Sequence, residues 1–313
     1  MLDIAIIGSG PAGMSAAIYG TRTGLNTLVI EQIYHGTGQL SESSHIANYL
    51  GIPEISGYEL GEKFRTHATQ LGVNFQEGKV IGMEQTNEHW IIHLKNDTQI
   101  ESKAIVFATG ASHRHLNIPG EEELTGKGVS YCATCDGAFY KDKDVAVIGG
   151  GNTALGDALY LSNLCHKVYL IHRRDSFRGN PESLTKIHQK SNIEIITPAQ
   201  PTEIIGDDAS GVTAIKLSTD RTLAVSSVFV AVGMQPSTTM LEGIISLDKA
   251  GYIIADESGM TSAAGFFAAG DVRTKQNRQI VTAVADGANA AISAEKYVAQ
   301  KIRIQKLPTP TKP

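Results

Sequence analysis

Residues 4–13 read IAIIGSGPAG, four apolar residues followed by three glycines at the spacing Gly-x-Gly-x-x-Gly. The apolar run is suited to a buried parallel strand. The glycines permit a tight turn and the close approach of a pyrophosphate group, which is held at the positive end of the helix that follows. The stretch therefore predicts the start of a doubly wound α/β domain. Its predicted nucleotide-binding positions are Gly8, Gly10, Pro11, Ala12 and Gly13.

The next apolar run supplies an acid. Residues 27–30, Thr-Leu-Val-Ile, end in Glu31. A carboxylate at the end of the second strand is placed to bind the ribose hydroxyls of an adenosine. A glycine motif alone is weak evidence, but strand, glycines, helix, strand and acid in this order predict a dinucleotide site.

A second copy of the pattern begins with residues 145–154, VAVIGGGNTA. From the first glycine to the residue that follows the second strand, both copies span 23 positions, from Gly8 to Glu31 and from Gly149 to His172. The equal spacing predicts two nucleotide sites in one chain.

Basic residues occupy the position where the first copy has its acid. His172 is followed by Arg173 and Arg174, with Arg178 close behind. An acid there favours a free 2′-hydroxyl, whereas arginines favour a 2′-phosphate through charge-assisted hydrogen bonds. A basic surface turn is the alternative reading. We expect FAD at the first site and NADPH at the second.

Between the two copies lies a cysteine motif, Cys132-Ala-Thr-Cys135-Asp136-Gly. Two cysteines at this spacing can close and open a small disulfide ring, and the first thiol of such a pair can have a lowered pKa. Asp136 is placed to act as the proton donor or acceptor of dithiol chemistry. Half of a zinc site is the alternative, but zinc needs four ligands, and the chain has neither a second Cys-x-x-Cys nor histidines at a suitable spacing. We therefore predict a redox disulfide and no metal.

Composition excludes several other classes of protein. The 313 residues suffice for two domains, and 42% hydrophobic with 19% charged residues is typical of a globular chain. A net charge of −5 gives no reason to expect nucleic acid or an anionic membrane as a partner. Three cysteines do not make a secreted disulfide framework, and neither a signal peptide nor an apolar stretch of membrane-spanning length is found. We expect a cytoplasmic location.

Loops and strand ends add further candidate ligands. The loop 36–40 is suited to lie against a planar group, and Asn48 can offer its amide to a ring. Segments around 79–100 and 193–230 are expected to form β-structure. Two buried strands are expected to end at Thr109-Gly110 and Gly270-Asp271, and a helix is expected at about 279–300, followed by a tail, 306–313, with no core-forming pattern.

The order of motifs GSGPAG, CATCDG, GGGNTA, HRRDSFR, FFAAGDV and RQIVTAVADGANAA resembles low-molecular-weight bacterial thioredoxin reductase over nearly the whole chain. The resemblance implies an α/β fold with two Rossmann-like, three-layer ββα nucleotide-binding domains. It implies a discontinuous FAD domain, 1–113 and 244–313. The NADPH domain, 114–243, carries the cysteine pair and is inserted between the two parts.

The resemblance also implies roles for individual residues. Cys135 is expected to face the flavin, Cys132 to attack the thioredoxin disulfide, and Asp136 to be the acid. The implied FAD contacts are Gly8, Gly10, Pro11, Ala12, Gly13, Glu31, Gly38, Gln39, Leu40, Asn48, Thr109, Gly110, Gly270, Asp271, Arg278, Gln279 and Ile280. The implied NADPH contacts are Gly151, Asn152, Thr153, His172, Arg173, Arg174 and Arg178. Gly156-Asp157 departs from the family, whose members often have two glutamates there, and Cys165 matches no catalytic position.

The implied reaction is the NADPH-dependent reduction of a thioredoxin disulfide through FAD and the cysteine pair, in a homodimer whose NADPH domain rotates about its linkers. The rival function is a related flavin-dependent disulfide reductase with another protein acceptor or electron donor. A nucleotide-sensing interaction module without turnover is a further rival, which the complete motifs disfavour.

Overall fold

The computed structural model of the protein describes residues 1–33, 37–43 and 46–305. Gly36 of the predicted ligand-facing loop and the predicted tail 306–313 lie outside the described residues. Contacts divide the chain into two compact units: unit 1 comprises residues 1–43, 49–112 and 235–313, and unit 2 comprises 44–48 and 113–234. Within the described ranges, no helix is long and apolar enough to cross a bilayer.

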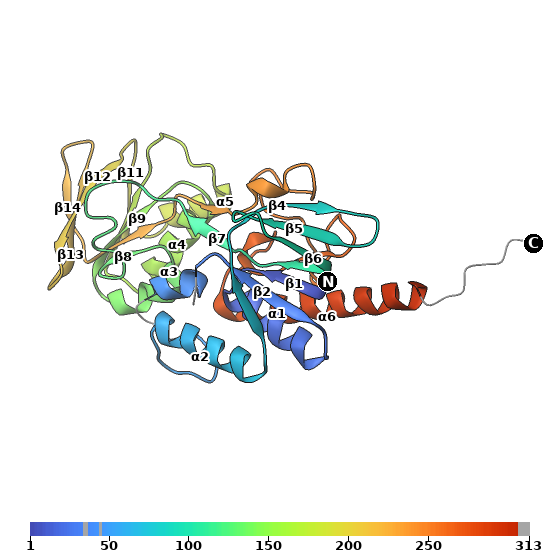
Figure 1. Cartoon of the computed structure of the whole chain (residues 1–313). Coiled ribbons are helices and arrows are strands. Elements are labelled where there is room, and N and C mark those ends of the chain that lie inside the picture. Colours follow the sequence, from blue (N-terminus) through green and yellow to red (C-terminus); the bar gives the residue numbers. More distant parts are fainter. Residues whose placement is uncertain (34–36, 44–45, 306–313) are drawn as a thin grey trace, which may run out of the picture. The chain divides into compact units, whose positions relative to one another are not determined.

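Unit 1 is built on a seven-stranded sheet (Figure 1). Its path is β3 (Asn74–Glu77), β2 (Thr27–Glu31), β1 (Leu2–Ile7), β6 (Gln99–Phe107), β5 (Trp90–Leu94) and β4 (Val80–Gln85). The first four strands of this path are parallel to one another. Strand β5 then pairs antiparallel with β6, and β4 pairs antiparallel with β5. The last strand along the chain, β17 (Phe266–Ala268), pairs in parallel with residues 105–107 of β6.

The alternating side chains of β1 separate two cores. Ile4 and Ile6 pack with α1 (Pro11–Arg22) and α6 (Ile280–Gln305), whereas Ala5 and Ile7 pack with the antiparallel strands around Trp90. Period-two alternation in a buried strand produces such a layered arrangement. The two helices pack closely at Gly287 of α6. A β-carbon at this position would overlap the carbonyl oxygen of Ala12 in α1.

The other elements of unit 1 connect these layers. They are η1 (Gly38–Glu42), α2 (Gly57–Gln70), η3 (Thr239–Leu241) and η4 (Gly270–Val272). A capping box begins α2, since the Ser56 side chain accepts from the Glu59 backbone N–H and the Glu59 carboxylate accepts from the Ser56 N–H.

Unit 2 has a five-stranded, wholly parallel sheet. Its order is β11 (Ile193–Ile196), β10 (Lys167–Ile171), β9 (Asp144–Ile148), β15 (Ser227–Val230) and β8 (Val129–Ser130). Val145 and Val147 of β9 pack with the helical layer, and Ala146 and Ile148 pack with an antiparallel layer. The helical layer holds α3 (Ala133–Asp136), η2 (Gly137–Tyr140), α4 (Asn152–Ser162) and α5 (Pro181–His188), and the antiparallel layer holds β12 (Pro201–Asp207), β13 (Gly211–Leu217) and β14 (Thr222–Ala224).

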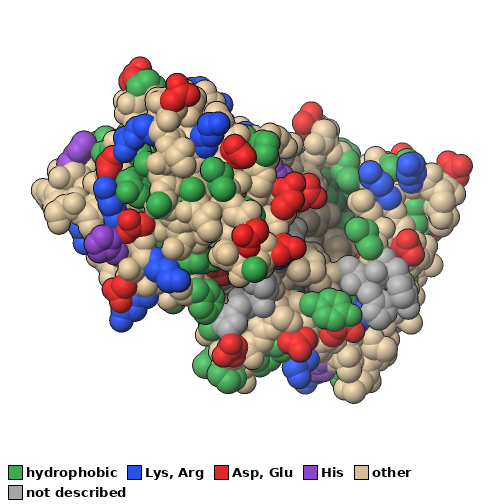
Figure 2. All heavy atoms as spheres, turned by 90° about the vertical axis from the view of Figure 1, so that its left-hand side faces the viewer, with side chains coloured by type: hydrophobic (Ala, Val, Ile, Leu, Met, Phe, Trp, Pro, Cys, Tyr) green, Lys and Arg blue, Asp and Glu red, His purple; other side chains and the backbone are tan. Residues whose placement is uncertain are grey.

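The two passages of the chain between the units pair as a two-stranded sheet, β7 (Ala111–His113) with β16 (Met234–Pro236). The expected β-structure around 79–100 and 193–230 is confirmed, and the expected final helix runs five residues beyond position 300. On the face shown in Figure 2, acidic and basic side chains are interspersed rather than gathered by sign.

Candidate nucleotide sites and redox centre

A cleft of about 370 Å³ lies in unit 2, at the carboxyl ends of its parallel strands. The lining residues Ile148, Ile171 and Ala231 end or directly follow β9, β10 and β15. This edge is where doubly wound sheets bind nucleotides, because loops and helix N-termini converge there. The second glycine motif forms one wall through Gly149, Gly150, Gly151 and Thr153.

The predicted basic residues divide between this cleft and its surroundings. His172, Arg173 and Arg178 line the cleft, whereas Arg174 and Asn152 are not among its lining residues. His172 is 7% exposed, its ring stacks on Phe177, and its Nε2 is buried without a hydrogen-bond partner among the described residues. Burial, aided by the arginine charges, lowers the pKa of His172, so the ring is neutral at pH 7. The cationic charge of the cleft therefore comes from arginine.

Arg114, His115 and Leu116 form a wall of the cleft that the sequence motifs do not predict. Gln200 also lines the cleft. The carboxylate of Glu121, 3% exposed, holds this wall by accepting the backbone N–H groups of Leu116 (2.9 Å) and Asn117 (2.7 Å). The same carboxylate accepts the Tyr131 hydroxyl at 2.9 Å. One buried acid thus connects the wall of the cleft to the residue before Cys132.

The cysteine pair forms a disulfide at the start of α3, with Cα atoms 5.3 Å apart. Cys132 is the N-cap residue of α3, and its carbonyl accepts the N–H groups of Cys135 and Asp136. The Asp136 carboxylate accepts the Ser130 hydroxyl at 2.6 Å. The disulfide, the acid and the cleft therefore belong to one unit of the fold. Within the described residues, no group of acids, histidines and cysteines could hold a metal ion.

The first glycine motif of unit 1 has the close approaches that only glycine permits. Gly8 follows β1 with φ of +106°, and a β-carbon there would meet the carbonyl of Ala108. A β-carbon on Gly13 would overlap the carbonyl oxygen of Gly8. Gly10 is the N-cap of α1, and Pro11 is its first residue, where a missing N–H has no cost. The free N–H groups of this helix start fit a pyrophosphate.

Two buried polar atoms near the ends of neighbouring strands β6 and β17 have no partner among the described residues: Thr109 Oγ1 and Asp271 Oδ1. Burial raises the pKa of Asp271, against the opposing charges of Lys275 and Arg278. Unpaired buried polar atoms are costly and are usually satisfied by a ligand or ordered water. Both atoms fit the hydroxyl groups of a bound FAD. Gly110 and Gly270 beside them have positive φ values of 69° and 78°.

Glu31, predicted to bind ribose, already has a protein partner. Its two carboxylate oxygens accept from Arg65 of α2 at 2.6 and 3.0 Å, and its side chain is 1% exposed. The Arg65 guanidinium also lies 3.4 Å from the centre of the Phe75 ring. Sequence reasoning missed this pair, because 34 positions separate the two residues. The ribose contact of Glu31 stays a prediction.

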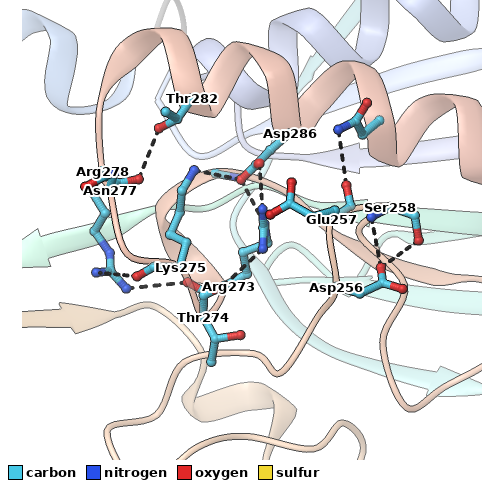
Figure 3. Close-up of polar contacts among 12 residues, drawn as sticks. Asp256, Glu257, Ser258, Arg273, Thr274, Lys275, Asn277, Arg278, Thr282 and Asp286 are labelled. Atoms are coloured by element: carbon cyan, nitrogen blue, oxygen red, sulfur yellow. Dashed lines mark hydrogen bonds and ion pairs between the residues drawn. The ribbon is translucent and has the colours of Figure 1, made fainter.

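The start of α6 is held by a buried ion cluster (Figure 3). The Asp286 carboxylate accepts from Arg273 at 2.8 and 2.9 Å, from Lys275 at 2.8 Å and from the Gly270 N–H at 3.0 Å. These bonds tie α6 to the loop after β17 that carries Asp271. Three predicted FAD contacts lie at this helix start, namely Arg278, Gln279 and Ile280. The Arg278 guanidinium stacks over the Tyr252 ring.

The remaining predicted flavin contacts lie apart. Gly38, Gln39 and Leu40 form the first turn of η1 in unit 1. Asn48 belongs to the short segment 44–48, which groups with unit 2. Its predicted contact with a flavin stays a prediction.

The departures from the family pattern also have definite places. Gly156 lies in α4, and a β-carbon there would meet nothing within 4 Å. Burial raises the pKa of its neighbour Asp157 to about 7. The Cys165 side chain is buried, and burial with the charges of Asp142 and Asp144 raises its thiol pKa to about 11, so this cysteine is unreactive.

Two dinucleotide-type sites and a Cys-x-x-Cys disulfide define a class of flavin-linked disulfide reductases. The chain belongs to the pyridine nucleotide-disulphide oxidoreductase family, which matches residues 2–287. It is 40% identical to thioredoxin reductase of Helicobacter pylori, over 95% of this chain and 99% of that protein. It is also 40% identical to thioredoxin reductase of Listeria innocua, over 95% and 93% of the two chains.

Solved structures agree. Thioredoxin reductase from Streptococcus pyogenes superimposes with a TM-score of 0.90 at 39% identity, covering 96% of this chain and 99% of that one. The predicted resemblance and the predicted α/β fold with two Rossmann-like domains are confirmed.

Proposed function

We propose that this protein is a thioredoxin reductase, which uses NADPH to reduce the disulfide of thioredoxin. The observation that carries the proposal is the Cys132–Cys135 disulfide, which lies in the same unit as a cleft lined by Arg173 and Arg178. The relatives named thioredoxin reductase match nearly the whole chain and support the same activity.

In this proposal unit 1 binds FAD and unit 2 binds NADPH. The predicted domain boundaries, 1–113 plus 244–313 and 114–243, stay a prediction. Bound together, the two cofactors supply a hydride donor and a carrier that passes an electron pair to a disulfide. The glycine turn, Thr109 and Asp271 would hold the FAD. Arg173 and Arg178 would hold the 2′-phosphate of NADPH in the cleft that His172 also lines.

The protein's own chemistry is thiol–disulfide exchange. Cys132 attacks the thioredoxin disulfide, Cys135 resolves the mixed disulfide, and Asp136 exchanges the proton that each thiol gains or loses. Since the dithiol and the NADPH cleft share one unit, the proposal includes rotation of that unit about the linkers β7 and β16. It also includes a homodimer and a cytoplasmic location.

The test is NADPH oxidation, followed at 340 nm, by the purified yellow protein in the presence of oxidised thioredoxin. We expect turnover that requires both cysteines. Cys135→Ser should trap on Cys132, as a mixed disulfide, a thioredoxin that bears a single reactive, activated cysteine. Cys165→Ser, the matched control, should behave as the parent.

Rapid NADPH oxidation with a different disulfide protein, but none with thioredoxin, would instead support the rival reductase with another acceptor. The proposal would be contradicted if the protein bound NADPH but did not oxidise it in the presence of any disulfide substrate. A monomer mass by light scattering at micromolar concentration would contradict the proposed homodimer.

A further inference from the structure

The hydroxyl of Ser130 contacts both the acid and the backbone of the redox motif. Ser130 ends β8, directly before Tyr131 and Cys132, and is 6% exposed. Its Oγ donates to Asp136 Oδ2 at 2.6 Å and accepts the Cys132 N–H at 3.1 Å. The Cys132 carbonyl, at 3.4 Å, is a longer alternative acceptor for the same hydroxyl. One hydroxyl carries one donor and two acceptor sites, so the two short bonds coexist.

The 3-10 turn η2 follows Asp136 directly in the chain. Burial raises the pKa of Tyr140, the last residue of η2, and the charge of Asp136 adds to this rise. Ser227 of β15, fully buried, donates to the Gly128 carbonyl at 2.7 Å. Asp136 thus accepts a hydrogen bond from a serine of β8, and its charge acts on a tyrosine of η2. Strands β8 and β15 pair with each other in the parallel sheet of unit 2.

We infer that Ser130 is a positioning residue for the proton chemistry of the dithiol. The Ser130 hydroxyl holds the Asp136 carboxylate against the backbone of Cys132. The inference rests on the proposed function for its catalytic meaning. A short hydrogen bond from a hydroxyl to a carboxylate stabilises the ionised acid. Ser130 therefore sets the pH at which Asp136 releases or takes its proton.

The exchange step shows why that pH matters. The reduced Cys132–Cys135 pair loses two S–H bonds and forms its S–S bond, while the S–S bond of the partner breaks and its two sulfurs become thiols. Two electrons and two protons pass from the enzyme to the partner. Because sulfur reacts as the thiolate, a proton in transit has to be held by another group. Asp136, adjacent to Cys135, is that group in the proposed function.

The experiment uses the full-length holoprotein reduced with dithiothreitol, and therefore needs neither NADPH nor thioredoxin. The rate at which iodoacetamide alkylates Cys132 is measured from pH 4 to 10, with the modified peptide identified by mass. The inflection that Asp136→Asn abolishes is assigned to Asp136. In Ser130→Ala we expect this inflection to move up by about one pH unit, the equivalent of one lost hydrogen bond to a charged group.

Two further variants separate the hydroxyl from packing. Ser130→Thr keeps a hydroxyl and should return the inflection to the parent position. Ser162→Ala removes another buried serine of unit 2, whose hydroxyl bonds only the Leu159 carbonyl in the described contacts, and should leave the inflection in place. An unmoved inflection in Ser130→Ala, or an equal shift in Ser130→Thr, would overturn the inference.

The same variants distinguish this inference from the proposed function. If the parent reduces thioredoxin, the pH profile of that activity in Ser130→Ala should move together with the alkylation profile, while NADPH-driven reduction of ferricyanide, which bypasses the dithiol, stays unchanged. If the parent does not reduce thioredoxin, the proposed function fails, and the alkylation profile still decides the role of Ser130.

Discussion

Replacing Asp286 by alanine should strongly destabilise unit 1. The side chains of Asp286, Arg273 and Lys275 are 6, 6 and 7% exposed, so the change leaves two buried cations without their counter-ion. Removing one member of a buried ion pair costs about 3–5 kcal/mol. The Gly270 N–H also loses its acceptor, which places the expected loss near the upper end of that range.

Trp90 provides the assay, because it is the only tryptophan of the chain, lies in unit 1 and is 1% exposed. Urea unfolding followed by its fluorescence should show a markedly lower midpoint for Asp286→Ala. Glu84→Ala is the matched control: it removes an exposed carboxylate that lies 3.4 Å from His93, and should cost less than about 1 kcal/mol.

The pH dependence gives a second check. Burial alone would raise the pKa of Asp286, but the hydrogen bonds from Arg273 and Lys275 outweigh it and lower the pKa below 3.8. The stabilisation is therefore fully present above pH 3.8 and is lost as the pH falls through the lower, folded-state pKa. A loss below 1 kcal/mol at pH 7 for Asp286→Ala, or a loss that does not shrink in acid, would refute this reasoning.

Three further changes test the nucleotide unit. Alanine at Arg173 and Arg178, which both line the cleft, should raise the dissociation constant of NADPH far more than that of NADH, and equal losses in a titration would show that the arginines do not bind the 2′-phosphate. Because burial raises the pKa of Asp157 to about 7, Asp157→Asn should melt higher than the parent at pH 8, with a gain that vanishes below pH 3.8; a gain that is independent of pH would contradict the cause. Glu121→Gln should weaken NADP⁺ binding about tenfold in calorimetry, since an amide cannot accept the same three hydrogen bonds, and unchanged binding would separate Glu121 from the cleft wall.

Local sequence patterns predicted the features that depend on neighbours along the chain. The strand–glycine–helix starts at Gly8 and Gly149 follow from backbone requirements that only a few residues meet, and the disulfide follows from the Cys-x-x-Cys spacing. The continuous apolar runs 4–7 and 145–148 predicted buried parallel strands, and β1 and β9 are indeed covered on both faces. Such features can be predicted without knowing the tertiary fold.

Contacts between distant segments could not be predicted in the same way. The Glu31–Arg65 pair joins a strand end to a helix with no shared motif. The cleft wall at Arg114 and His115 lines the same cleft as the distant glycine turn, and the Arg114 N–H donates to the carbonyl of Gly233. Ser130 has no sequence signature either. Its position beside Asp136 arises because α3 folds back within a single turn after β8.

Unit 1 is completed by residues that follow the whole of unit 2 in the chain. Both β17, which covers part of the edge of β6, and the buried face of α6 are synthesised after residue 234. At about 5–20 residues per second, the ribosome needs on the order of 10–40 s to proceed from Phe107 to Val298. During that interval an unpaired strand edge and an apolar sheet face of the nascent chain stay open to other chains. A chaperone that binds exposed β-edges therefore has its longest opportunity while unit 2, which needs no later residues, is already able to fold.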